Sequence, residues 1–393
     1  MNYMHNLTKF PFTVNYIIIL LVTAIIALIL TPIMVVVSRR IGAVDNPNAR
    51  RINLKPMPSA GGVAIFIAFS VITLFVLPRF VGLANHNRVN ATYLKYIWPI
   101  ILGGGIVAVT GLIDDILEIG AKSKLLGQTL GACVIWFFST SRFDNFKIPF
   151  GGPLLIFPTW LSFFATIFWI LAITNALNLI DGLDGLASGV SIISLTTMGI
   201  VSYFFLSTSD VYLPITIFVL VFAICGFFPY NFPPAIIYLG DTGALFLGFM
   251  ISVLSLQGLK NATAVAIVTP MIILGVPLTD TVVAMIRRKL NGGSIAVADR
   301  MHLHHRLLSL GLTPHAAVLV IYGIAGIFSF IALILNVSSR WGGIFLLIFS
   351  LIGLEVMIEL VGVLGKDRTP LLHIIKFVGN SDYRQEVKKK GKM

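Results

Sequence analysis

The sequence predicts an all-α, polytopic membrane protein with about eleven transmembrane helices, and two observations carry this prediction. Of the 393 residues, 57% are hydrophobic and only 11% are charged, whereas soluble domains contain roughly 25% charged residues. The mean hydropathy is +0.95, and apolar runs of about 20 residues, the length that crosses a hydrocarbon core, recur along the chain. These observations exclude a soluble globular protein and a disordered chain.

The apolar runs define the elements in order. The predicted spans are 13–37, 60–80, 97–113, 125–141, 160–177, 187–206, 211–229, 243–259, 263–286, 315–336 and 342–364. The first run is too long for the apolar core of a signal peptide and ends at Arg39 and Arg40, so we expect an uncleaved first span. Because no hydrophilic segment is long enough for a soluble domain, we expect one integral-membrane domain over 1–364 and a basic tail over 365–393.

Basic residues orient these spans. If eleven spans alternate, 20 of the 28 Lys and Arg residues fall on one side of the membrane, which the positive-inside rule identifies as the cytoplasm. The N-terminus is then outside and the C-terminus is cytoplasmic. The net charge of +12 is therefore expected to serve orientation in the lipid bilayer and not to bind nucleic acid. Cys133 and Cys225 lie inside apolar runs, so no disulfide framework is expected.

Carboxylates gather on the same side. Asp114 and Asp115 follow the third span, Asp181 and Asp184 follow the fifth, and Asp241 opens the eighth. Five aspartates at helix ends on one face would repel one another unless a cation lies among them. Mg²⁺, or alternatively Mn²⁺, is expected, because a hard cation takes one or two protein oxygens and fills its remaining positions with water and substrate phosphate. For any single aspartate, a helix N-cap or an Asx turn is the competing interpretation.

The fifth span ends in a polar segment with a repeat of three residues. Asn175, Asn178, Asp181 and Asp184 recur at that spacing, and glycines interrupt the helix around them. The glycines allow the chain to bend or tighten there. An amide pair followed by a carboxylate pair predicts a cradle for a metal diphosphate.

A histidine-rich segment follows the ninth span. His302, His304 and His305 fall within four residues and are flanked by Arg300 and Arg306. Arginine beside histidine suits an anion better than a cation, and no cysteine lies nearby to complete a zinc site. We therefore expect a phosphate or sugar contact, with a zinc site and a solvated loop as the alternatives.

Four blocks carry a resemblance to a known family: IDDILE, NALNLIDGLDGLASG, PYNFPPAIIYLGDTGALFLG and HLHHRLLSLG. In this order they resemble the signature blocks of the bacterial polyprenyl-phosphate N-acetylhexosamine-1-phosphate transferases, over residues 13–340. The resemblance implies an enzyme of the bacterial cytoplasmic membrane that moves a sugar 1-phosphate from a UDP-sugar to undecaprenyl phosphate, with its active site on the cytoplasmic face and UMP as the second product.

The histidine segment also bears on the sugar. Family members that use UDP-N-acetylmuramoyl-pentapeptide carry three adjacent histidines, whereas this chain has His-Leu-His-His. The resemblance therefore favours UDP-N-acetylglucosamine as donor, as in the group that initiates teichoic acid, O-antigen and related polymers. A phospho-N-acetylmuramoyl-pentapeptide transferase is the alternative within the family.

The resemblance also implies roles for individual residues. It makes Asp241 and Asn178 metal ligands, with Lys124 facing the phosphates. The other residues expected to contact the substrates are Lys55, Asn175, Asn231, Tyr238 as the stacking platform for uracil, Gly240, His302, His304 and His305. The family implies no requirement for Arg306, so its role stays open although it lies beside the histidines.

Two routes remain open for the reaction itself. Asp114 or Asp115 could orient the acceptor, hold a water or take a residual proton, with Asp181 and Asp184 counted among the catalytic carboxylates. Alternatively, Asp114 or Asp115 could form an aspartyl-phosphate intermediate.

A transporter or channel with a cytoplasmic metal site is the alternative from a different class. Transporters place ionisable groups near the bilayer midplane, and Glu355 and Glu359 lie well inside the last predicted span. A helix contact or an oligomer interface, such as that of a homodimer, is the favoured interpretation of this pair.

Overall fold

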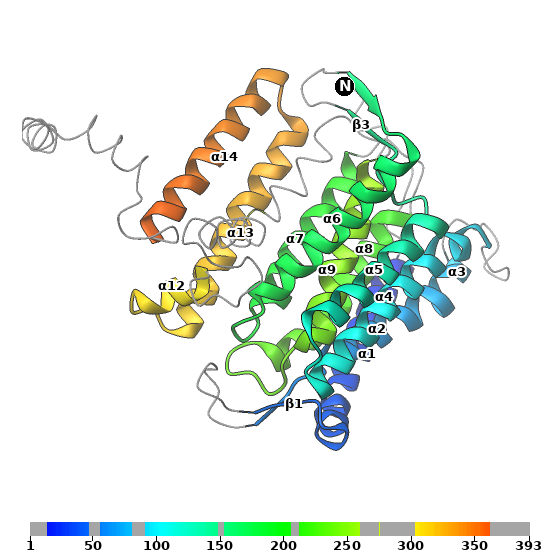
Figure 1. The fold of residues 1–393 in the computed structure, drawn as a ribbon, viewed down its shortest axis with the longest axis vertical. Coiled ribbons are helices and arrows are strands. Elements are labelled where there is room, and N and C mark those ends of the chain that lie inside the picture. Colours follow the sequence, from blue (N-terminus) through cyan, green and yellow to red (C-terminus); the bar gives the residue numbers. More distant parts are fainter. Residues whose placement is uncertain are drawn as a thin grey trace, which may run out of the picture.

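The structure is a bundle of long helices (Figure 1). It is a computed structural model that describes residues 14–46, 56–80, 91–147, 153–205, 212–259, 275 and 303–361. The helices are α1 (Val14–Ile41), α2 (Gly62–Val71), which continues through the π-helical η2 (Ile72–Val76) into α3 (Leu77–Phe80), α4 (Ala91–Leu117), α5 (Ala121–Phe138), α6 (Thr159–Ile180), α7 (Leu186–Phe204), α8 (Tyr212–Asn231), α9 (Gly240–Leu259), α12 (Leu303–Ser309), α13 (Pro314–Val337) and α14 (Arg340–Val361).

Two short antiparallel hairpins complete the described elements. β1 (Val44–Asp45) pairs with β2 (Met57–Pro58) between α1 and α2, and β3 (Asn145–Lys147) pairs with β4 (Leu154–Ile156) between α5 and α6. Figure 1 shows the two hairpins at opposite ends of the bundle.

The prediction of an all-α polytopic membrane protein is confirmed. Eight described segments are long and apolar enough to cross a membrane, namely α1, the continuous segment Gly62–Arg79, α4, α6, α7, α8, α9 and α13. Each coincides with a predicted span. α5 and α14 occupy the fourth and eleventh predicted spans but are not among the eight. The ninth predicted span, apart from Gly275, and the tail over 365–393 lie outside the described residues. The count of eleven spans and the placement of the termini remain predictions.

α9 forms the core of the bundle. It packs against α2, α4, α5, α6, α7 and α8, and every side chain from Thr242 to Gln257 is buried. A helix that is apolar and buried on all sides belongs at the centre of a bundle. α13 and α14 pack on each other, and α13 joins the bundle along α7. Figure 1 shows this pair at one side of the other helices.

One end of the bundle, called the site end below, collects the ends of six helices. The C-terminal ends of α4, α6 and α8 meet the N-terminal ends of α5, α7 and α9 there. The backbone N–H of Asp241, in the first turn of α9, donates to Asp115, and the hydroxyl of Ser188 donates to Asn231. The β1–β2 hairpin closes this end, since the backbone N–H of Tyr238 donates to the carbonyl of Pro58 over 2.8 Å. Connections between helices therefore bring the predicted motifs together.

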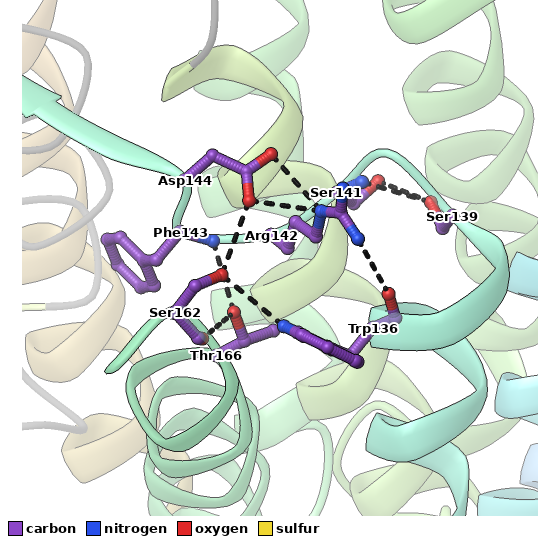
Figure 2. Close-up of polar contacts among 8 residues, drawn as sticks. All are labelled: Trp136, Ser139, Ser141, Arg142, Phe143, Asp144, Ser162 and Thr166. Carbon is purple, nitrogen blue, oxygen red and sulfur yellow. Dashed lines mark hydrogen bonds and ion pairs between the residues drawn. The ribbon is translucent and has the colours of Figure 1, made fainter. Parts of the chain in front are cut away.

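The opposite end, called the distal end, is held by its own polar network. Figure 2 shows Arg142 paired with Asp144, and Asp144 accepting a hydrogen bond from Ser162. Next to this cluster, Gln257 donates to Ser141 over 2.7 Å and accepts from Tyr96 over 2.6 Å. These bonds link α4 and α9 to the connection after α5, so the helices are fixed to one another at both ends.

Candidate active site

Asp241 is the centre of the candidate site. It lies in the first turn of α9, and its two carboxylate oxygens have partners from two other helices. Nζ of Lys124 lies 2.5 Å from Oδ2, and the amide Nδ2 of Asn178 donates to Oδ1 over 2.5 Å. Residues from α5, α6 and α9, far apart in the sequence, therefore converge on one carboxylate.

Asp114 shares the same ammonium group. Its Oδ2 lies 2.6 Å from Nζ of Lys124, so a single lysine balances two carboxylates. The other oxygen, Oδ1, is buried, and no donor among the described residues bonds to it. A buried carboxyl oxygen without a donor is costly, and the Asp114 carboxyl lies beside a second one, that of Asp241. The site has spare capacity for a positively charged partner.

Asp115 points to a different set of groups. Its Oδ1 accepts from the backbone N–H of Asp241 over 2.9 Å. Its Oδ2 accepts from the backbone N–H and the hydroxyl of Thr242 over 3.0 and 2.5 Å. Neighbouring residues on a helix are rotated by about 100°, so the two aspartates face different partners.

Gly240 is required by the shape of the chain where α9 begins. Its φ is +71°, in the left-handed region that favours glycine. A Cβ at this position would lie 1.6 Å from the carbonyl oxygen of Ser59. Gly240 was predicted to contact the substrates. The structure adds a second reason for glycine at this position, because glycine allows the chain to turn into α9 directly before Asp241.

The turn between α6 and α7 supplies the second pair of aspartates. Burial of the Asp181 carboxyl raises its pKa well above the usual range. The negative charges of Asp241, Asp115 and Asp184 contribute less and in the same direction. Asp181 is therefore close enough to the other carboxylates to belong to the same electrostatic cluster. Oδ2 of Asp184 accepts from the backbone N–H of Ala235 over 2.9 Å, which fixes the connection between α8 and α9.

Asn175 faces a neighbour that sequence reasoning missed. Its Nδ2 donates to Oε1 of Gln128 and to the carbonyl of Leu171, each over 2.7 Å. Gln128 is completely buried and lies one helical turn beyond Lys124. The Gln128–Asn175 pair therefore holds α5 and α6 together next to the residues that contact Asp241. A glutamine inside an apolar run was the available signal.

Asn231 and Tyr238 belong to the connection between α8 and α9. The side chain of Asn231 is buried, accepts from the hydroxyl of Ser188 over 2.6 Å and donates to the carbonyl of Ile237 over 3.1 Å. Its amide is thus engaged within the protein. Tyr238 is partly exposed, and its backbone N–H and carbonyl are fixed by Pro58 and Gly61.

The histidine segment forms the short helix α12, which packs on α13 and α14. Leu303 and Leu307 are buried and anchor it, while His305 and Arg306 are partly exposed. For His304 only the backbone, within α12, is described. His302 and Lys55 lie outside the described residues.

α13 connects this segment to the site end through two contacts that the sequence did not suggest. The hydroxyl of Tyr322 donates to the carbonyl of Gly185 over 2.5 Å, directly after Asp184. The ring of His315 lies edge-on to Phe232, with centroids 5.5 Å apart. The helix that follows α12 is therefore docked on both connections that carry site residues.

The donor set fits a hard divalent cation with few protein ligands. Within the part of the chain that the structure describes, no three His, Cys, Asp or Glu side chains are grouped so as to cage a metal ion. Mg²⁺ does not need such a cage, because it is commonly bound through one or two carboxylates, waters and substrate phosphates. The carboxylate of Asp241, the amide oxygen of Asn178 and Oδ1 of Asp114, to which no described donor bonds, are oxygen atoms of the kind that would suit such an ion.

Comparisons with known proteins place the chain in a family. Residues 97–259, which hold all five aspartates and Lys124, match the model of glycosyl transferase family 4. The chain is 39% identical, over 92% of its length and 97% of the relative's, to a Bacillus subtilis (strain 168) protein named "Probable undecaprenyl-phosphate N-acetylglucosaminyl 1-phosphate transferase".

More distant relatives carry related names. A decaprenyl-phosphate N-acetylglucosaminephosphotransferase of Mycolicibacterium smegmatis is 33% identical over 79% of each chain. An undecaprenyl-phosphate alpha-N-acetylglucosaminyl 1-phosphate transferase of Salmonella typhi is 28% identical over 72% of this chain and 74% of its own. Because the Bacillus subtilis relative is 39% identical over 92% of this chain and residues 97–259 match the family model, the chain belongs to glycosyl transferase family 4.

Proposed function

We propose that this protein transfers N-acetylglucosamine 1-phosphate from UDP-N-acetylglucosamine to undecaprenyl phosphate, with release of UMP. The observation that carries the proposal is the cluster in which Lys124 and Asn178 hold Asp241 where four helices meet. The names of the relatives support the donor and the polyprenyl acceptor. The positive-inside rule supports a cytoplasmic location for the site end.

In the proposed reaction, an oxygen of the acceptor phosphate attacks the sugar-linked phosphorus of the donor. The bond from that phosphorus to the bridging oxygen breaks, and UMP leaves with the bridging oxygen. A phosphate monoester has its second pKa near 6, so the acceptor is mostly a dianion at pH 7. The protein then has less need of a strong base than of positive charge that relieves repulsion between two anions.

Of the residues that the structure describes, Lys124 is the best placed to supply that charge. Its ammonium already lies between two carboxylates, 2.6 Å from Asp114 and 2.5 Å from Asp241. Asp241 and Asn178, with Asp114 alongside, would hold the Mg²⁺ ion, for which Mn²⁺ could substitute. Such an ion, when bound, neutralises phosphate charge and orients the diphosphate. Binding of the phosphates would then draw Lys124 from the carboxylates toward phosphate oxygens.

The bonds of the paired aspartates favour direct displacement over a covalent intermediate. Both oxygens of Asp115 accept hydrogen bonds from α9, which lowers their nucleophilicity, and one oxygen of Asp114 is paired with Lys124. Direct displacement predicts that labelled UMP does not exchange into UDP-N-acetylglucosamine when the lipid acceptor is absent. Robust exchange that disappears in Asp114→Asn would instead support an aspartyl-phosphate.

The remaining assignments follow the chemistry of the donor. Tyr238, partly exposed at the site end, is proposed to stack on uracil, with Lys55 near the nucleotide. His302, His304 and His305, with Arg306, are proposed to grip the sugar 1-phosphate, because imidazole and guanidinium groups donate to phosphate and sugar oxygens. His304→Ala should then impair turnover far more than the binding of UMP.

The test uses the purified full-length chain in detergent with undecaprenyl phosphate, Mg²⁺ and radiolabelled UDP-N-acetylglucosamine. We expect release of UMP together with a labelled lipid product, and loss of both in Asp241→Ala although the variant stays folded. UDP-N-acetylmuramoyl-pentapeptide serves as the competing donor. Turnover of that donor alone, or wild-type turnover in Asp241→Ala, would contradict the proposal.

A further inference from the structure

Asp115 is bonded to the backbone rather than directed at the space where substrates would bind. Three donors surround its carboxylate, and all three belong to the first turn of α9: the N–H of Asp241 and the N–H and hydroxyl of Thr242. We propose that Asp115 is a positioning residue that caps α9 from α4 and so fixes the carboxylate of Asp241. This inference rests on the proposed function, in which Asp241 holds the metal ion.

The first turn of any helix leaves N–H groups without partners inside the helix. They are usually satisfied by the side chain of the residue where the helix begins. Here α9 begins at Gly240, after Leu239, and neither residue has a side-chain oxygen. The cap must come from elsewhere, and the structure supplies it from a residue 126 positions earlier in the chain.

A carboxylate suits this position better than a neutral acceptor. Hydrogen bonds to an ionised acceptor are stronger than those between neutral groups, and the N-terminus of a helix favours negative charge. Oδ2 of Asp115 accepts two bonds while Oδ1 accepts one. The three bonds together fix both the direction of the α9 axis and its rotation at the first turn.

The packing around this cap leaves little room for adjustment. A Cβ on Gly111, one turn before Asp115, would lie 2.5 Å from the carbonyl oxygen of Asp241. A Cβ on Gly240 would lie 2.7 Å from Oδ2 of Asp115. The backbone of α4 therefore touches the backbone of α9 at the site, and a shift of the cap moves Asp241 directly.

The two adjacent aspartates, Asp114 and Asp115, therefore have different roles in the proposal. Asp114 pairs with the ammonium of Lys124 over 2.6 Å, within the proposed catalytic cluster. Asp115 contacts neither Lys124 nor Asn178 through any bond of its carboxylate that the described residues show, and holds α9 instead. The pair would act as one catalytic carboxylate and one support.

The test compares Asp115→Asn and Thr242→Val with Thr242→Ser, which retains the hydroxyl donor. Two measurements on the purified protein without substrate are needed: the affinity for Mn²⁺ by electron paramagnetic resonance, and hydrogen exchange of the amides in the first turn of α9. We expect Asp115→Asn to weaken Mn²⁺ binding by about 10- to 100-fold, as loss of supporting residues does in other metal sites, with faster amide exchange.

Thr242→Val should weaken Mn²⁺ binding by roughly fivefold, as expected for the loss of one hydrogen bond, while Thr242→Ser stays within about twofold of wild type. This series keeps the inference testable if Asp115→Asn fails to fold. Turnover of Asp115→Asn should recover in part as Mg²⁺ is raised, because the defect lies in holding Asp241.

Two results would overturn the inference. Wild-type Mn²⁺ affinity and amide exchange in Asp115→Asn, with turnover lost even at saturating Mg²⁺, would make Asp115 a group that acts on substrate. Faster exchange in α9 with unchanged Mn²⁺ affinity would show that the cap does not reach Asp241. Neither measurement uses the donor or acceptor, so failure of the proposed transferase activity would be recognised separately, by absent UMP release in the wild type.

Discussion

Lys124 is the only described cation bonded to two of the clustered carboxylates, and its contribution can be separated from that of general surface charge. Its side chain is only 24% exposed. The side chain of Asp114 is more buried than that of Lys124, and the side chain of Asp241 is buried to a similar extent. Removing one partner from a largely buried ion pair leaves charge without compensation. The stability of the protein without metal should therefore depend on this lysine.

Lys124→Met should lower the free energy of unfolding of the metal-free protein by about 3 kcal/mol, the low end for a broken buried pair. Lys122→Met is the matched control, because Lys122 is exposed on the same turn of α5 and its loss should change stability by no more than about 0.5 kcal/mol. Thermal unfolding in EDTA measures both. Equal midpoints for the two variants would mean that Lys124 does not stabilise the cluster.

Asp181 makes the stability of the metal-free protein depend on pH. Burial and neighbouring carboxylates raise its pKa in the folded protein, whereas the unfolded value is about 3.9. The folded state thus binds a proton more tightly than the unfolded state, and the stability that this provides is lost as pH rises from the unfolded to the folded pKa. In Asp181→Asn the side chain is neutral at every pH and has nearly the shape of the protonated carboxyl.

The difference in thermal midpoint between Asp181→Asn and wild type should therefore become more favourable to the variant between pH 4.5 and pH 8, measured in EDTA. The sign follows from proton binding alone and does not require a change in packing. If the difference were constant across this range, the carboxyl would titrate alike in the folded and unfolded states, and the electrostatic cluster would not include Asp181.

Among the elements, α2 and α9 are in close backbone contact near the site end. A Cβ on Gly62 would lie 2.2 Å from Cα and from N of Gly243. These are backbone atoms, which cannot rotate away. Without a hydrophobic force between helices in lipid, association depends on close packing of this kind, for which small residues are needed.

Gly62→Ala should therefore destabilise the protein by about 1–3 kcal/mol, the usual cost of overpacking, although alanine favours a helix over glycine by about 1 kcal/mol. Gly323→Ala in α13 is the matched control, since a Cβ there would have no described atom within 4 Å other than the backbone of its own helix turn, and it should be neutral or stabilising. The measurement is the thermal unfolding midpoint of each variant, determined in the same detergent. A neutral Gly62→Ala would mean that α2 can move away from α9 without loss.

The sequence predicted the elements well because apolar runs report helix length, and it predicted the gathering of aspartates because alternating spans place their connections at common ends. It could not assign partners. Asp114 and Asp115 look equivalent in the sequence, yet one binds Lys124 and the other caps α9. Lipid-facing and core-facing positions are both apolar. The sequence pattern therefore does not show how each helix is rotated about its axis or which helices are neighbours. These two properties decide such contacts as that of Gln128 with Asn175.

On the scale of the whole molecule, two groups of helices form the site end. One is the set of helices packed around α9, which hold Asp241 and its partners. The other is α13 with α12 and α14, which carries the histidine segment. Figure 1 shows α13 running beside α7 toward the end where α12 lies. In the proposed reaction turnover needs both sets, because the residues proposed to bind the metal ion lie in the first and those proposed to bind the sugar phosphate lie in the second.

Tyr322 is the best described link between them, since its hydroxyl donates to the carbonyl of Gly185 over 2.5 Å. Tyr322→Phe removes this bond, worth about 1 kcal/mol, and keeps the ring, whereas Tyr322→Leu removes both. We expect turnover to fall by roughly fivefold in the first variant and further in the second, with faster hydrogen exchange over α12 and the start of α13. The affinity for Mn²⁺ should stay unchanged, because Tyr322 does not contact Asp241 or its partners. Unaltered turnover and exchange in both variants would show that other contacts, such as His315 with Phe232, are sufficient to dock α13.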